Sequence, residues 1–280
     1  MPLILLILKI YIKILISKVY KLVMQILAVQ NRMGIGDTII YLPYIKAISE
    51  KFNTPVSVLV KENSKADQYL RETKYIDKII YLKRGGRKNN RHDGLIGALK
   101  LAKDLKQYKF NNVFIFNSSL RFNLISRLAG INEIYQYPLF YKKNQHVTDP
   151  AKKLIKRSLD IEVDKNPEIQ IDEEKVKIAN SKFNMFNFEY NILLAIGGSG
   201  PTKRIPAKTF ISFMEKINKI KNCKFYLATG KNENEQEILN EILNSELKNK
   251  CVPLDDFSIS EILPIIKNCN ISVCNDTSFS

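Results

Sequence analysis

The chain has 280 residues, of which 45% are hydrophobic and 26% charged; this is the composition of a folded globular protein and excludes a disordered chain. The formal net charge of +16 indicates an anionic partner or surface, and the length allows two domains. Two histidines exclude a histidine-rich metal site, and four cysteines without CxxC spacing support neither a zinc site nor a disulfide framework, so we expect free thiols of a reducing compartment.

The first 24 residues combine an aliphatic background with four lysines, Lys9, Lys13, Lys18 and Lys21. No apolar run reaches the ~18 residues that a spanning helix needs, and the order of charge and apolar core is not that of a signal peptide. At 100° per residue the lysines fall on one half of a helix, which predicts an amphipathic helix at a membrane surface. A misassigned start codon, or a helix docked on the protein itself, remains the alternative.

Residues 25–165 alternate between strand and helix patterns, which predicts βαβ units on a parallel sheet. The expected strands are residues 25–30, 56–60, 76–82 and 112–116, and the expected helices run to about residue 52 and over 95–105 and 120–128.

The first strand is followed by a loop that contains Arg32, Gly34, Gly36 and Asp37. The dinucleotide fingerprint GxGxxG fails here because its third glycine would be Ile39. An acid at the carboxyl end of a strand lies where open α/β sheets place their ligands, so Asp37 is a candidate functional residue. The alternative role of Asp37, capping the following helix, is compatible with this one.

Two segments are rich in basic residues. Residues 83–91, which include Arg84 and Arg87, form either a solvated loop or a clamp for an anionic acceptor. Residues 141–157 form a second basic patch.

The periodic pattern of apolar residues is lost over residues 160–172, where we expect a linker and a returning strand. We expect a helix over residues 173–186. A second alternation starts with a strand at 192–196 and continues with a helix at 210–220, a strand at 224–229 and a helix at 233–247. Ser258 and Glu261 have capping-box spacing before a further helix, and a strand at 271–274 follows. The chain stops just after this strand, before the helix that should cover it. Either the sequence is a fragment, which is the interpretation we favour, or the second domain is incomplete and marginally stable.

The glycine-rich turn over residues 197–206 lies between a strand and a helix, where free backbone N–H groups and the helix dipole favour an anion. Lys203 and Arg204 add two positive charges at the same place. The turn is not a P-loop, because no Gly-Lys-Ser/Thr closes it. An ordinary loop with a solvated basic pair is the alternative.

Three motifs together resemble glycosyltransferase family 9, the ADP-heptose:lipopolysaccharide heptosyltransferases. Residues 32–38 resemble the family's first loop ending in Gly-Asp, and residues 197–206 its phosphate-binding loop, with Ile205 where the family usually has tryptophan. Residues 275–277 resemble its Asp-Thr-Gly signature, with Ser278 in place of the glycine. The resemblance implies an α/β fold of the GT-B type, with two Rossmann-like parallel-sheet domains facing a cleft. The expected divisions are a lead helix (1–24), an acceptor-side domain (25–165), a linker (166–190) and an incomplete nucleotide-sugar domain (191–280).

The resemblance also implies roles for individual residues. Asp37 resembles the general base that deprotonates the acceptor hydroxyl, and Lys203 the lysine that stabilises the departing diphosphate. The implied donor-binding residues are Gly197, Gly198, Ser199, Thr202, Arg204, Asn232, Glu233, Asp276 and Thr277, with the backbone of Gly198 and Ser199 donating to the diphosphate. The acceptor-side candidates are Arg32, Gly36, Arg84 and Arg87.

The resulting hypothesis is an inverting glycosyltransferase that moves a sugar, heptose by family default, from a nucleotide diphosphate donor to a lipopolysaccharide-core or other lipid-linked acceptor. Neither cofactor nor metal is expected. The expected partners are ADP-heptose, an anionic lipid-linked saccharide and the inner face of the cytoplasmic membrane. The alternative hypothesis is a catalytically degenerate, membrane-associated protein that binds a sugar nucleotide or an anionic glycolipid. Nucleic-acid binding is disfavoured because no basic motif interleaved with aromatics is present.

Overall fold

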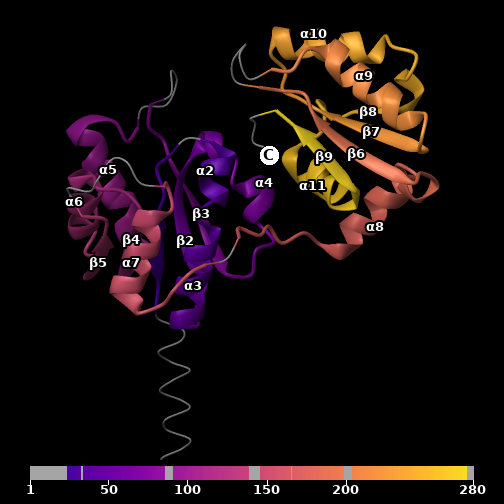
Figure 1. Cartoon of the computed structure of the whole chain (residues 1–280). Coiled ribbons are helices and arrows are strands. Elements are labelled where there is room, and N and C mark those ends of the chain that lie inside the picture. The colour runs from indigo at the N-terminus through magenta and orange to yellow at the C-terminus, as the bar shows by residue number, and fades with distance from the viewer. Residues whose placement is uncertain are drawn as a thin grey trace, which may run out of the picture. The chain divides into compact units, whose positions relative to one another are not determined.

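A computed structural model of the protein describes residues 24–32, 34–85, 91–138, 146–164, 166–198 and 204–275. The lead helix expected over residues 1–24 therefore lies outside the described residues, apart from Met24. The chain divides into two compact units, Met1–Ile169 and Gln170–Ser280, and each has its own parallel sheet (Figure 1). No helix within the described ranges is long and apolar enough to span a membrane.

The N-terminal unit is built on a five-stranded sheet in the order β3-β2-β1-β4-β5. Its elements are β1 (Ile26–Val29), α2 (Ile35–Ile39), α3 (Leu42–Phe52), β2 (Val56–Lys61), α4 (Asp67–Leu70), β3 (Ile76–Leu82), α5 (Gly94–Lys106), β4 (Asn112–Ile115), α6 (Leu120–Leu128), β5 (Glu133–Gln136) and α7 (Asp149–Leu159).

Helices cover both faces of this sheet. All four residues of β1 are buried, as expected for a central parallel strand. Leu27 and Val29 pack with residues of α5 and α6 on one face. On the other face α3 contacts α7, and Phe52 at the end of α3 lies edge-on to Phe114 of β4. Helices lie on both faces because each crossover is right-handed and the direction of travel across the sheet changes. The chain moves from β1 through β2 to β3 at one edge, then returns past β1 to β4 and β5 at the other edge.

The C-terminal unit has a four-stranded parallel sheet in the order β8-β7-β6-β9. Its elements are α8 (Glu173–Lys182), β6 (Tyr190–Ala195), α9 (Ala207–Asn218), β7 (Cys223–Ala228), α10 (Glu233–Leu243), β8 (Cys251–Pro253), α11 (Ile259–Asn268) and β9 (Ile271–Cys274). Alternate residues of β6 divide the core: Ile192 and Leu194 pack with α9 and α10, whereas Leu193 packs with α8 and α11.

Most of the predicted elements are present, and the capping box of Ser258 and Glu261 at the start of α11 is confirmed. The strand expected to return within 160–172 is wrong, since the described residues there form neither helix nor strand. Pro167 and several acids replace the apolar periodicity that a buried strand needs. The helix predicted over 173–186 ends at Lys182, because Asn184 takes a left-handed conformation with φ of 49°.

Candidate active site

Each sheet has one place where neighbouring strands connect in opposite directions, and open α/β folds bind ligands there, at the carboxyl ends of the strands. In the N-terminal unit this place lies between β1 and β4, and in the C-terminal unit between β6 and β9. The loop with Asp37 follows β1, the glycine-rich loop follows β6, and Asn275 follows β9. These three loops therefore begin at the switch point of their unit, whereas Arg84 follows β3 and Asn232 and Glu233 follow β7.

The loop after β1 holds Asp37 through a series of local contacts. Gln30 is buried at the end of the strand; its side-chain amide donates to the backbone carbonyl of Asp37 and accepts from the backbone N–H of Arg32. Gly34 has φ of 106°, which L side chains rarely adopt, and this turn starts α2. The Thr38 hydroxyl donates to the Gly34 carbonyl at 3.2 Å. Gly36, the neighbouring acceptor-side candidate, lies in α2 with open space beside it.

The Asp37 carboxylate is partly buried and has one cationic neighbour. Its Oδ1 lies 3.8 Å from Nη1 of Arg32, and the side chains of Asp37 and Arg32 are 34% and 45% exposed. Burial raises the pKa of Asp37 above its ordinary value, and the Arg32 charge lowers it by a smaller amount. Partial burial strengthens the base without removing it from solvent, which suits a carboxylate that accepts a proton from a bound hydroxyl.

The loop after β4 faces the same switch point and was not singled out from the sequence. Asn117 accepts from the Ser119 backbone N–H at 2.9 Å, and Gln136 of β5 donates to the carbonyls of both residues. Within the described part of the chain, Nδ2 of Asn117 and Oγ of Ser118 are buried without a hydrogen-bond partner. Such atoms are unusual in a native fold and make this loop a candidate for contact with a polar ligand.

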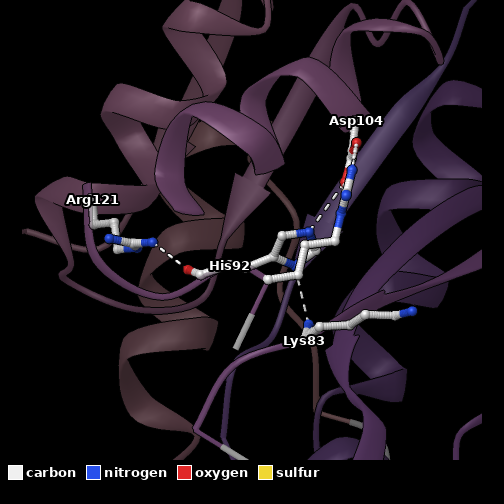
Figure 2. Close-up of polar contacts among 5 residues, drawn as sticks. Lys83, His92, Asp104 and Arg121 are labelled. Atoms are coloured by element: carbon white, nitrogen blue, oxygen red, sulfur yellow. Dashed lines mark hydrogen bonds and ion pairs between the residues drawn. The ribbon is translucent and has the colours of Figure 1, made fainter. Parts of the chain in front are cut away.

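The basic loop between β3 and α5 is closed at its base by His92 (Figure 2). His92 is buried; its Nδ1 accepts from the Lys83 backbone N–H at 3.1 Å, and its Nε2 lies 3.1 Å from Oδ2 of Asp104. Arg91 holds the same carboxylate with two hydrogen bonds and, with His92, lowers the pKa of Asp104. Arg84 lies 3.4 Å from Asp93 in an ion pair, so both ends of the loop are fixed.

In the C-terminal unit a glutamate joins the loops that follow the neighbouring strands β6 and β7. Glu235 of α10 is buried; one carboxylate oxygen accepts from the Gly198 N–H at 2.7 Å and the other from the Gly230 N–H at 3.0 Å. A β-carbon on Gly197 would lie 3.1 Å from this carboxylate, and one on Gly230 would overlap it. The close approach of the acid therefore leaves little room for a side chain at either glycine.

This arrangement corrects one expectation about the donor loop. The Gly198 N–H already donates to Glu235, so it does not point to a diphosphate in this structure. Of the two donor-binding candidates in the loop after β7, Asn232 caps α10 by accepting from the Glu235 N–H, and Glu233 is exposed. Glu235 was not singled out from the sequence, although Asn232-x-x-Glu235 has capping-box spacing. Its carboxylate accepts hydrogen bonds from the neighbouring loops instead of from the Asn232 backbone.

Asn275 fixes the other side of the glycine-rich loop. Its side chain donates to the Ile196 carbonyl at 2.9 Å and accepts from the Ile205 N–H at 3.3 Å, so it joins both described ends of the loop. Arg204 lies beside this contact and is half-buried. The remaining candidates lie outside the described residues: Ser199, Thr202, Lys203, Asp276, Thr277 and Arg87. In the described ranges no three His, Cys, Asp or Glu side chains come together as metal ligands.

Comparison with known proteins then identifies the family. The profile of glycosyltransferase family 9 (heptosyltransferase) matches residues 98–280, which is more than half of the chain. The chain belongs to glycosyltransferase family 9. As a family 9 protein it is a glycosyltransferase, and its family-level activity is sugar transfer from a nucleotide donor.

Solved structures with the same fold include other family 9 proteins. The Escherichia coli ADP-heptose LPS heptosyltransferase II is 16% identical with a TM-score of 0.70, over 91% of this chain and 80% of that one. A family 9 glycosyltransferase from Veillonella parvula DSM 2008 is 17% identical with a TM-score of 0.72, over 91% and 76%. E. coli heptosyltransferase WaaC with ADP-2-deoxy-2-fluoro heptose is 15% identical with a TM-score of 0.64, over 92% and 84%. No curated protein matches the chain.

These likenesses confirm the predicted fold class, an α/β protein with two parallel sheets of the GT-B type. The family 9 match also covers the glycine-rich loop and residues 275–277, two of the three motifs from which the resemblance was drawn.

Proposed function

We propose that this glycosyltransferase moves heptose from ADP-heptose, with inversion, to a lipopolysaccharide-core or other lipid-linked acceptor. The observation that carries the proposal is the partly buried Asp37 carboxylate, paired with Arg32 at the β1–β4 switch point. Family membership supports the class of donor. One E. coli protein of similar fold is named an ADP-heptose LPS heptosyltransferase, and another was solved with ADP-2-deoxy-2-fluoro heptose.

In the proposed reaction Asp37 takes the proton of an acceptor hydroxyl while the hydroxyl oxygen attacks the anomeric carbon of the donor sugar. The new C–O bond forms as the bond to the diphosphate breaks, so the nucleoside diphosphate leaves with the bonding electron pair and the anomeric configuration inverts. The Arg32 charge opposes the effect of burial on the pKa of Asp37 and so favours the ionised carboxylate, the form that accepts the proton.

The departing diphosphate requires positive charge, and we assign that role to Lys203, with Arg204 beside it. Their side chains supply charge neutralisation without a metal, so we expect turnover to continue in EDTA. Lys203→Ala should lower the transfer rate by about two or more orders of magnitude, the effect of removing one donor that stabilises developing charge. Lys208, an exposed lysine of the following helix α9, provides the matched control as Lys208→Ala.

The charge of the chain supports the proposed class of acceptor. Removing the lead segment's four lysines still leaves a strongly basic chain, which suits an anionic lipid-linked saccharide at the inner face of the cytoplasmic membrane.

The test is incubation of the chain with a panel of nucleotide sugars and a water-soluble, deacylated core saccharide, followed by NMR of the product. ADP-heptose is expected to be consumed only with acceptor present, and the new linkage should have the anomeric configuration opposite to the donor. Transfer from another nucleotide sugar in preference would overturn the assigned donor, and a retained configuration would overturn the role of Asp37.

A further inference from the structure

Six large aliphatic side chains lie exposed on two helices of the N-terminal unit. On α5 and α6 these residues range from Leu128, 46% exposed, to Leu95, 84% exposed. The set, called the α5–α6 face below, consists of Leu95, Ile96, Leu99, Leu120, Leu124 and Leu128. Single exposed leucines are ordinary, but a group on neighbouring helices marks an interaction surface.

The two helices present these residues as one surface. They contact each other on the same face of the sheet, where Figure 1 draws them side by side. Arg121 in the first turn of α6 donates to the Gly94 carbonyl at the start of α5 at 2.7 Å, so the two helices begin together. Leu95 directly follows Gly94 and Leu120 directly precedes Arg121, and the spacing of four places Leu124 and Leu128 in a stripe behind Leu120.

Basic residues accompany the apolar ones. Together α5 and α6 contain five basic residues and one acid, Asp104. That acid is already engaged by Arg91 and His92. Lys100, Lys103 and Lys106 are exposed in the second half of α5, behind the apolar first half. Aliphatic side chains with lysines behind them match a surface whose interior is apolar and whose headgroups are anionic.

The position of the face relates it to the active site. α5 follows β3 and α6 follows β4, so both helices begin at the carboxyl edge of the sheet, the edge that carries Asp37. Lys83 and Arg84 lie at the same edge, where His92 ties the Lys83 backbone to α5 (Figure 2). A bilayer that meets the α5–α6 face would lie next to the loops around the Asp37 carboxylate.

We propose that the α5–α6 face is a docking surface for an anionic phospholipid bilayer, separate from the lead segment. The inference deepens the proposed function and relies on it for the presence of a lipid-linked acceptor. Charge favours this occupant over two others. The lead segment carries four lysines and a second copy of the chain is itself basic, so both would meet a face of their own sign.

The chain has no tryptophan, which allows one reporter to be placed on the face. In the full chain, Leu124→Trp puts the reporter at a position that is 54% exposed, and Ile178→Trp puts the matched control at a position on α8 that is 59% exposed. Each variant is mixed with vesicles of phosphatidylglycerol and phosphatidylcholine, with and without brominated acyl chains.

The expected result for the Leu124→Trp variant is a blue shift and bromolipid quenching of its indole fluorescence in phosphatidylglycerol vesicles, with weaker effects in pure phosphatidylcholine. The Ile178→Trp variant should show neither effect. Three results would overturn the proposal. These are no change in the fluorescence of the Leu124→Trp variant, equal quenching in both variants, or an indole emission in the Leu124→Trp variant that is already blue-shifted without lipid. In the last case a dependence on protein concentration would identify a second copy as the occupant, and its absence would identify the lead segment.

A second variant measures the contribution of the face. Leu120→Gln/Leu124→Gln/Leu128→Gln should lower partitioning into the anionic vesicles by roughly tenfold or more, whereas Ile178→Gln/Phe186→Gln should leave it unchanged. Unchanged partitioning in the triple variant would refute docking through this face.

Transfer to the water-soluble acceptor separates this proposal from the proposed function, since the triple variant should keep that activity. Lost vesicle binding with transfer retained would support docking. Transfer absent from the unmodified chain would count against the proposed function and leave the vesicle result to stand by itself.

Discussion

At the scale of single residues, Asp37 connects the structure to the pH dependence of transfer. Burial raises the pKa of its carboxyl group and Arg32 lowers it, and only the ionised form accepts a proton. The acid limb of kcat/KM should therefore lie above the pH expected for an ordinary aspartate. Arg32→Gln removes the lowering effect, so the limb should move to still higher pH in a pH–rate profile. A limb that stays in place or moves to lower pH would show that Asp37 does not govern it.

Glu235 is one of the residues whose role was not predicted from the sequence. Its carboxylate accepts from the Gly198 and Gly230 N–H groups, and an amide in its place would turn one hydrogen-bond donor towards another. Glu235→Gln should lower the free energy of unfolding by about 1–3 kcal/mol, measured by urea denaturation, and raise the KM for the nucleotide sugar. The exposed neighbour Glu233 supplies the control, because Glu233→Gln should change stability by less than ~0.5 kcal/mol. Equal effects of the two substitutions would remove Glu235 from this positioning role.

At the scale of elements, α5 depends on a glycine that allows the chain to pass over it. A β-carbon on Gly97 would overlap the carbonyl carbon of His92 and lie 2.8 Å from its Cα, and both are backbone atoms. Gly97→Ala should destabilise the protein by about 1–3 kcal/mol in thermal or urea unfolding, because backbone must move. Gly36→Ala is the matched control, since Gly36 is also helical and has open space around it; it should be neutral or stabilising by up to ~1 kcal/mol. The reverse order of stabilities would contradict the packing described for the start of α5.

Elements with strong local signals were predictable from the sequence. The alternation of apolar strands and amphipathic helices predicted two parallel sheets, and the spacing of Ser258 and Glu261 predicted the start of α11. β5 and β8 were missed because their residues are half-exposed at sheet edges and lack an apolar run. α7 was interpreted only as a basic patch, although its four basic residues share the helix with a buried apolar side formed by Ala151, Leu154 and Ile155.

The candidate site, too, was predictable only in part. A loop with Gly-Asp after a first strand predicted where Asp37 would lie, since the end of a strand at a switch point is fixed by topology. The contacts of Gln30, Glu235 and Asn275 join segments distant in the sequence or depend on the exact turn of a loop. No local pattern encodes such contacts, so they became visible only in three dimensions.

At the scale of the whole molecule, the charge of +16 should make membrane binding sensitive to salt. Coulombic attraction to anionic lipid weakens as the Debye length falls from ~10 Å at 0.1 M to ~3 Å at 1 M ionic strength. We expect partitioning of the full chain into phosphatidylglycerol vesicles, measured by co-sedimentation, to fall across this range, with a residual fraction held by apolar contact. Neutral vesicles provide the control. Binding that is equal at both salt concentrations would show that the basic surface takes no part.

The central claim is that Asp37 is the base of a heptosyl transfer, and the most direct measurement compares single-turnover transfer from ADP-heptose in three forms of the full chain. The unmodified chain and Asp77→Asn, which changes an exposed aspartate of β3, should transfer at the same rate. Asp37→Asn should be slower by about 10²–10⁴-fold while its unfolding transition is unchanged, because the amide cannot accept the proton. Transfer by Asp37→Asn at the unmodified rate would contradict the account.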